Sequence, residues 1–206
     1  MSETAPKIGI HYVALGDSYT IGVGVQEEER WPNILTSHLN EAGIETTLVA
    51  NPAVSGYTVR NTIELELDEV QRYKPDFVTL FIGANDSFQQ IDTTTYQKEL
   101  HELLDKLQTL MVNPKNIVLV TIPDYTLSPA FAQYEKERVR NLIKEYNEII
   151  KSEGKTRGLP VADIFPVSET MKSEADYVSD GLHPSAQGIT KWEKVIFPVV
   201  LRLLKK

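Results

Sequence analysis

Residues 76–83 read DFVTLFIG, and residues 116–123 read NIVLVTIP. Both runs are almost continuously apolar and do not alternate between apolar and polar residues. A strand with this pattern is covered on both of its faces, as in a parallel sheet that lies between two layers of helices. These two runs therefore predict the central strands of an α/β protein.

Three further short β-rich runs complete the pattern, and longer helical patterns separate all five. The predicted strands are residues 8–15, 46–50, 76–82, 117–122 and 159–162. Strands that alternate with helices imply right-handed crossover connections. The sequence predicts a three-layer α/β/α sandwich with a mainly parallel five-stranded sheet. It shows no repeat or linker, so we expect one domain over residues 1–206.

Two of the helical patterns give specific expectations. In residues 58–73, TVRNTIELELDEVQRY, apolar residues recur at Val59, Ile63, Leu67 and Val70, which predicts one amphipathic helix. The next pattern opens with Thr94 and has Gln97 three residues later. This spacing predicts a capping box at the start of that helix.

Composition excludes several classes of function. The chain carries 29 acidic and 21 basic residues, a net charge of −8. Nucleic-acid binding needs clustered cations, so we expect no nucleic-acid partner. The absence of cysteine excludes disulfides, thiolate metal sites and a cysteine nucleophile.

The apolar segments are too short for a membrane span, which needs about 20 residues. The start of the chain, MSETAPKIGIHYVAL, lacks the basic region and the long apolar run of a signal peptide. We therefore expect a cytoplasmic protein with no integral membrane segment, or a secreted one if a leader was removed.

Polar residues follow the predicted strands at four places. They are Gly16-Asp17-Ser18, Gly56 in NPAVSG, Gly83-Ala84-Asn85-Asp86, and Asp180 with His183 in DGLH before the last helix. Ligands of open parallel sheets bind beyond the carboxyl ends of the strands, so these residues are expected at one edge.

The types of these residues suit acyl transfer. A serine at a strand-to-helix turn is a candidate nucleophile if a base removes its proton, and an Asp-x-x-His pair can supply an oriented imidazole. Gly56 and Asn85 are candidate donors to a developing oxyanion. Each feature alone also fits a turn or cap, and we expect Asp17 to hold backbone amides and shape its turn.

In this order, the four blocks resemble those of the SGNH hydrolases, also called the GDSL esterase/lipase family. The resemblance implies a flavodoxin-like fold and hydrolysis of a small-molecule acyl ester, thioester or lysophospholipid through an acyl-enzyme, without metal or cofactor. Ser18 would be the nucleophile, His183 the base and Asp180 the residue that orients it. The Ser18 and Gly56 N–H groups and the Asn85 side chain would form the oxyanion hole.

Alternatives remain at this stage. The same fold serves carbohydrate O-acetyl esterases and could serve a binding protein without turnover. A metal-dependent phosphoesterase could use Asp17, Asn85, Asp86 and His183 as ligands. Residues 123–134 and 19–30 are expected to wall an acyl pocket, whereas the other three histidines, at positions 11, 38 and 101, are expected outside the site.

Overall fold

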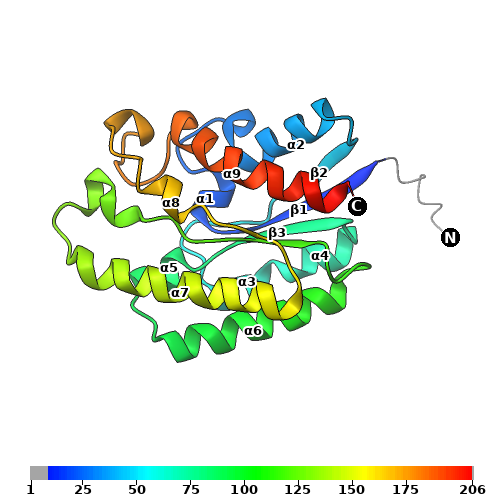
Figure 1. Cartoon of the computed structure of the whole chain (residues 1–206), viewed down its shortest axis with the longest axis horizontal. Coiled ribbons are helices and arrows are strands. Elements are labelled where there is room, and N and C mark those ends of the chain that lie inside the picture. The colour runs from blue at the N-terminus through cyan, green and yellow to red at the C-terminus, as the bar shows by residue number, and fades with distance from the viewer. Residues whose placement is uncertain (1–8, 206) are drawn as a thin grey trace.

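The computed structural model describes residues 9–205. Its sheet has the order β2-β1-β3-β4-β5, and every neighbouring pair is parallel (Figure 1). The strands are β1 Ile10–Gly16, β2 Thr46–Ala50, β3 Phe77–Phe81, β4 Ile117–Val120 and β5 Val161–Ala162. This is the flavodoxin-like order, whose direction reverses at β1 and β3. The predicted five-stranded parallel sheet is confirmed, and each predicted strand overlaps an observed one.

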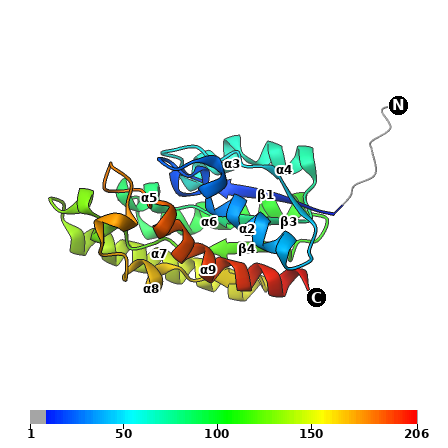
Figure 2. The ribbon, with the colours of Figure 1, turned by 90° about the horizontal axis from the view of Figure 1, so that it is seen from above.

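Helices cover both faces of the sheet. They are α1 Ser18–Ile21, α2 Trp31–Glu41, α3 Val59–Leu65, α4 Leu67–Tyr73, α5 Ala84–Phe88, α6 Thr93–Leu110, α7 Lys136–Arg157, α8 Phe165–Ser168 and α9 Ala186–Leu204. In Figures 1 and 2, α2 and α9 pack together on one face, and α3, α6 and α7 form the layer on the other. The three-layer prediction is therefore confirmed. The single domain over residues 1–206 stays a prediction.

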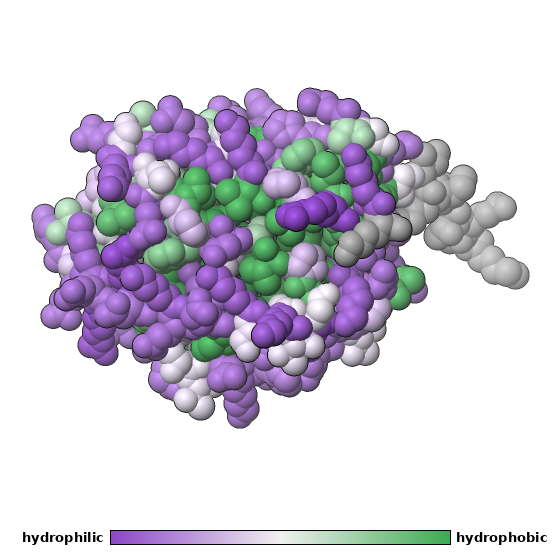
Figure 3. All heavy atoms as spheres, in the orientation of Figure 1, coloured by the Kyte–Doolittle hydropathy of each residue, from purple (hydrophilic) through white to green (hydrophobic). Residues whose placement is uncertain are grey.

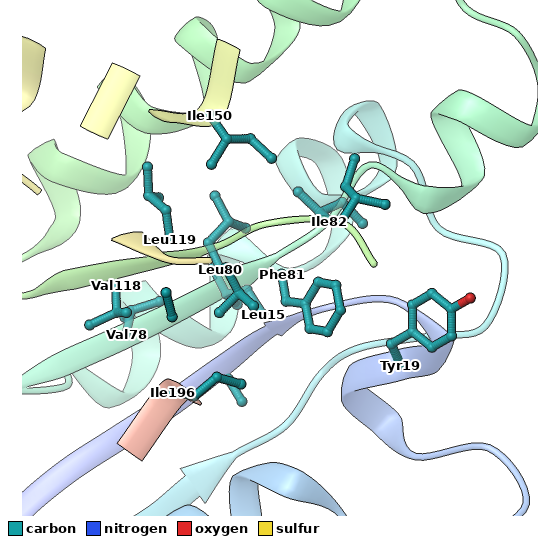
Figure 4. Close-up of a cluster of buried hydrophobic side chains, with 14 of the residues drawn as sticks. Leu15, Tyr19, Val78, Leu80, Phe81, Ile82, Val118, Leu119, Ile150 and Ile196 are labelled. Atoms are coloured by element: carbon teal, nitrogen blue, oxygen red, sulfur yellow. The ribbon is translucent and has the colours of Figure 1, made fainter. Parts of the chain in front are cut away.

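The core lies on both faces of β3 and its neighbours (Figure 4). Val78, Leu80 and Phe81 of β3 are all buried, as are Leu119 of β4 and Ile196 of α9. This burial explains the continuous apolar run in DFVTLFIG, because a central parallel strand has no solvent-facing side. The sheet thus provides a rigid base for the loops at its carboxyl edge.

The helix predicted over residues 58–73 is divided in two, so that prediction is wrong in one respect. Its apolar stripe is buried as expected, but α3 ends at Leu65 and α4 begins at Leu67. Glu66, between them, is fully buried, and its carboxylate accepts a hydrogen bond from the Gly16 N–H at 2.9 Å. We infer that the break lets Glu66 turn inward to satisfy this amide.

The capping box predicted at Thr94 is also wrong. Helix α6 begins at Thr93, and Asp92 is its N-cap, accepting a hydrogen bond from the Thr95 N–H at 3.0 Å. A carboxylate next to a helix N-terminus also interacts favourably with the helix dipole, which explains why Asp92 takes this position.

Polar side chains cover most of the face in Figure 3, and apolar atoms show through in its middle, where the edge strand β5 lies between α9 and α7. Within residues 9–205, no helix is both long and apolar enough to cross a membrane.

Candidate active site

Ser18 is presented by the tight turn between β1 and α1. Asp17 is the N-cap of α1, and its carboxylate accepts a hydrogen bond from the Tyr19 N–H at 3.0 Å, as expected from the sequence. Gly16 leaves no room for a side chain, because a Cβ there would lie 2.3 Å from Thr20 Oγ1 and 2.4 Å from the Phe81 carbonyl oxygen. The turn therefore requires glycine at position 16 and places Ser18 at the first residue of α1.

Asp180 and His183 form a close pair in the loop before α9. Asp180 Oδ2 lies 2.6 Å from His183 Nδ1, and Oδ1 accepts from the N–H groups of Leu182 and His183 at 2.8 and 3.0 Å. Partial burial opposes the charge of Asp180, but these hydrogen bonds outweigh it and hold its pKa below the ordinary value. The carboxylate thus fixes Nδ1 as the protonated nitrogen and leaves Nε2 to act as an acceptor.

The candidate oxyanion donors come from three different loops. Among the described residues, no hydrogen-bond partner is found for the backbone N–H of Ser18 or of Gly56. Gly56 has a φ of 89°, in the positive-φ region that glycine adopts more readily than other residues do. The Asn85 Nδ2 donates to the Tyr57 carbonyl at 2.9 Å and to Asp17 Oδ2 at 3.3 Å, which fixes the side chain in place.

These groups meet at one pocket of about 270 Å³ at the carboxyl edge of the sheet. Ser18, Gly56, Asn85 and His183 all line it. Ser18 makes no side-chain hydrogen bond to His183 among the described residues, although both face the same space. Such contacts are often long in free enzymes and shorten when substrate binds. The sequence-predicted residues are therefore brought together, with Asp180 behind His183.

A cluster of buried carboxyl groups lies beneath the pocket. Burial raises the pKa of Asp17 to about 8, and the charges of Asp86 and Glu66 add to the rise. Burial likewise raises the pKa of Glu66 and of Asp86 to about 7, against the effect of hydrogen bonds from Gly16 and Thr62 to Glu66 and from Val59 to Asp86. Glu66 and Asp17 thereby hold the N–H groups of Gly16 and Tyr19 on either side of Ser18, and Asp86 holds that of Val59 at the start of α3.

The four residues that a metal-dependent phosphoesterase could use as ligands are not arranged around a common metal position. Asp86 is fully buried and accepts hydrogen bonds from the Val59 N–H, while Asp17 holds Tyr19 and Asn85. Within residues 9–205, no group of three or more carboxylate or histidine side chains is placed to hold a metal ion. His38 pairs instead with Glu193 at 2.9 Å, away from the pocket.

Aromatic residues wall the pocket on one side. Tyr125, Phe131 and Tyr134 come from the loop after β4, as predicted for residues 123–134. The prediction for residues 19–30 is mostly wrong, because only Tyr19 of that segment lines the pocket. Phe88, which also lines the pocket, was not predicted from the sequence and lies one helical turn after Asn85 on α5. The i, i+3 spacing from Asn85 could have indicated it.

The comparisons with known proteins agree with this geometry. The model of the GDSL-like Lipase/Acylhydrolase family matches residues 14–190, which include all the site residues above. The chain belongs to this family.

Two relatives carry esterase names. A multidomain esterase of Ruminococcus flavefaciens is 33% identical over 131 residues, 62% of this chain and 16% of its own length. An acetylxylan esterase of Geobacillus stearothermophilus is 30% identical over 148 residues, 68% of this chain and 66% of its own length. The chain thus spans less than two thirds of either relative.

Solved structures share the fold across almost the whole chain. TesA superposes with a TM-score of 0.76 at 17% identity, covering 94% of this chain and 99% of its own. The acetylxylan esterase Axe2 of Geobacillus stearothermophilus gives 0.74 at 22% identity, covering 93% and 94%. The expected SGNH hydrolase fold is thereby confirmed.

Proposed function

We propose that the protein is a serine hydrolase that cleaves carboxylic esters of small molecules through an acyl-enzyme on Ser18. One observation carries the proposal. The Asp180–His183 pair, at 2.6 Å, lies at the same pocket as a buried serine whose backbone N–H has no hydrogen-bond partner among the described residues. Membership of the GDSL-like Lipase/Acylhydrolase family supports it.

The reaction follows from the arrangement. His183 Nε2 takes the proton of the Ser18 hydroxyl while Oγ forms a bond to the ester carbonyl carbon. The carbonyl oxygen becomes an oxyanion, which accepts hydrogen bonds from the Ser18 and Gly56 N–H groups and from Asn85 Nδ2. For this, one Nδ2 hydrogen leaves its longer bond, at 3.3 Å, to Asp17 Oδ2. The C–O bond to the alkoxy group then breaks, and His183 returns the proton to the leaving alcohol.

A second cycle releases the acid. Water loses a proton to His183 and attacks the acyl carbon, and the collapse of the second tetrahedral intermediate restores the Ser18 hydroxyl. Asp180 accepts the Nδ1 hydrogen bond throughout and stabilises the imidazolium. No step uses a metal or an organic cofactor, so EDTA is expected to leave turnover unchanged.

The test compares turnover of p-nitrophenyl acetate by the wild type, Ser18→Ala and Ser55→Ala. Ser55 is a matched control, because it is a second serine of the same pocket. We expect Ser18→Ala to lose at least about 10³-fold in kcat and Ser55→Ala to change it by only a few fold. Equal activity of Ser18→Ala and wild type would refute the assignment of Ser18 as the nucleophile.

A second candidate is an O-acetyl esterase that acts on carbohydrate. The 30% identity with a protein named acetylxylan esterase favours it. Comparing kcat/KM for acetylated xylo-oligosaccharides with that for simple alkyl esters separates the two candidates. The cytoplasmic location expected from the sequence stays a prediction.

A further inference from the structure

Three aromatic rings form a contiguous group at the mouth of the pocket, and we name them the aromatic cluster. Phe88 ends α5, Phe131 ends the short 3-10 helix Pro129–Phe131, and Tyr134 lies before α7. The ring centroids of Phe131 and Tyr134 are 4.8 Å apart. The ring centroid of Phe88 lies 6.3 Å from that of Phe131 and 6.2 Å from that of Tyr134. These distances are typical of packed aromatic pairs.

The outer rings of the cluster are unusually exposed. Phe88 is 52% exposed and Tyr134 is 56% exposed. Among residues 9–205, only three other large hydrophobic side chains are comparably exposed, and they are Val54, Leu65 and Val112. Two neighbouring exposed aromatic residues leave apolar surface in water, which is unfavourable until a ligand covers it.

The aromatic cluster lies between two hollows. On one side is the pocket of about 270 Å³ that Ser18 and His183 line, and on the other is a second hollow of about 290 Å³. All three rings line both hollows, and the second is completed by Val139 and by the polar side chains of Gln90, Glu135 and Arg138. A chain that leaves the scissile bond can therefore continue along the rings for several carbon atoms.

Hydrogen bonds and ring contacts fix the position of the aromatic cluster relative to the proposed reacting groups. The Ala130 N–H, next to Phe131, donates to the Gly181 carbonyl at 3.0 Å in the loop that carries His183. The Tyr125 ring packs 5.3 Å from that of Phe131, and its hydroxyl lies 2.7 Å from Ser87 Oγ on α5. A ligand on the rings is thus positioned relative to both the oxyanion donors and the imidazole.

The lining of the pocket favours an apolar chain over a sugar. A sugar ring carries several hydroxyls that need hydrogen-bond partners when they leave water. Apart from the reacting groups, the pocket lining carries the hydroxyls of Tyr19, Ser55 and Tyr134, whereas the Tyr125 hydroxyl is already bonded to Ser87. Ala84, Ala130 and Leu182 supply the rest of the contact surface.

We propose that the aromatic cluster binds the apolar chain of the substrate, so that esters with an alkyl or aryl chain of several carbons are preferred over acetylated sugars. This inference rests on the proposed function. Burial of one methylene contributes up to roughly fourfold in kcat/KM, so specificity should increase with chain length until the rings are covered. The chain is either the acyl or the alkoxy part of the ester.

The experiment measures kcat/KM over two series. The acyl series is p-nitrophenyl acetate, butyrate, hexanoate and octanoate, and the alkoxy series is ethyl, butyl, hexyl and octyl acetate. The proteins are the wild type, Phe88→Ala, Phe88→Ala with Tyr134→Ala, and the control Val112→Ala. Val112 is 84% exposed and lies outside both hollows, so its substitution matches the loss of an exposed apolar side chain.

We expect kcat/KM to rise at least 10-fold from shortest to longest substrate in one series, and that series identifies which part of the ester lies on the rings. The double variant should lose most of this rise, and Val112→Ala should keep it. A flat dependence in both series, a rise that the double variant keeps, or faster turnover of acetylated xylo-oligosaccharides would each overturn the inference. Measurable turnover of acetate esters in any of these cases leaves the proposed function standing. If the wild type turned over none of these esters, that result would instead refute the proposed function itself.

Discussion

The Asn85 side chain is tied to the carboxyl of Asp17: its Nδ2 lies 3.3 Å from Asp17 Oδ2. The two residues follow neighbouring strands, β1 and β3, and meet where the strand order of the sheet reverses. Asp17 thus joins the loop that carries Ser18 to the loop that carries the third candidate oxyanion donor. Asn85 Nδ2 also donates to the carbonyl of Tyr57, next to Gly56, so its two hydrogen bonds tie together the three loops that carry the candidate donors.

Removing the Asn85 amide should therefore slow the chemical step. We expect Asn85→Ala to lower kcat about 10²–10³-fold with a smaller effect on KM, because the lost donor acts mainly on the charged intermediate. Steady-state kinetics with p-nitrophenyl acetate provide the measurement. A change confined to KM would show that Asn85 binds substrate and does not stabilise the oxyanion.

Asp180→Asn tests the residue that orients the imidazole. An amide oxygen can still accept from the Leu182 and His183 N–H groups, so the loop should keep its shape. The charge that stabilises the imidazolium is lost, and kcat should fall about 10²–10⁴-fold. The thermal unfolding temperature of the variant should stay close to that of the wild type. Full activity in Asp180→Asn would exclude its proposed role.

Gly16→Ala tests the tight turn before Ser18. The added Cβ would clash with Thr20 and the Phe81 carbonyl, so we expect a loss of about 3 kcal/mol in the free energy of unfolding. Gly43→Ala is the control, because Gly43 has a φ of 80° but open space around its Cβ position. It should cost about 1 kcal/mol, through backbone strain alone. Urea denaturation measures both, and an equal cost for the two variants would argue against the clash.

The buried carboxyls predict that stability falls as the pH rises. Asp17, Glu66 and Asp86 have folded pKa values of about 8, 7 and 7, well above the values of exposed acids. The folded state therefore holds more protons than the unfolded state near neutral pH. The stability that this provides is fully present below the ordinary carboxyl pKa of about 4, decreases as the pH rises, and is lost once the pH has passed 7–8.

Between pH 6 and pH 9 the free energy of unfolding should decrease by a few kcal/mol, with about 5 kcal/mol as an upper bound. Glu66→Gln removes one of the three titrating groups and keeps an oxygen for the Gly16 N–H, so it should reduce the dependence by about a quarter. Urea denaturation at both pH values is the measurement. Equal stability of the wild type at pH 6 and pH 9 would contradict the raised pKa values.

The sequence predicted the sheet, and the placement of Ser18, Gly56, Asn85 and His183 at one pocket, for a definite physical reason. The continuous apolar runs at 76–82 and 117–122 identify strands buried on both faces, and such strands fix where their following loops lie. Ser18, Gly56 and Asn85 follow the three neighbouring parallel strands β1, β2 and β3, so their meeting point followed from topology. The Asp180–His183 contact followed from a spacing of three residues within one turn.

The features that were missed depend on packing between distant segments. The break at Glu66 lets its carboxyl accept a hydrogen bond from the Gly16 N–H, which lies 50 residues away along the chain. Phe88 joined the pocket wall because the loop after β4 folds against α5, a contact that no local pattern encodes. Residues 19–30 looked suited to line the pocket, but mainly Tyr19 faces it, because the chain then turns away into α2.

The most direct test of the central claim is covalent labelling of Ser18. The protein is treated with a fluorophosphonate, which phosphonylates only a serine activated by an adjacent base, and the adduct is located by peptide mass spectrometry. We predict one adduct, on the peptide that contains Ser18, formed rapidly by the wild type, at least about 10²-fold more slowly by His183→Ala, and not at all by Ser18→Ala. A wild-type protein that stays unlabelled, or an adduct that persists in Ser18→Ala, would contradict the account.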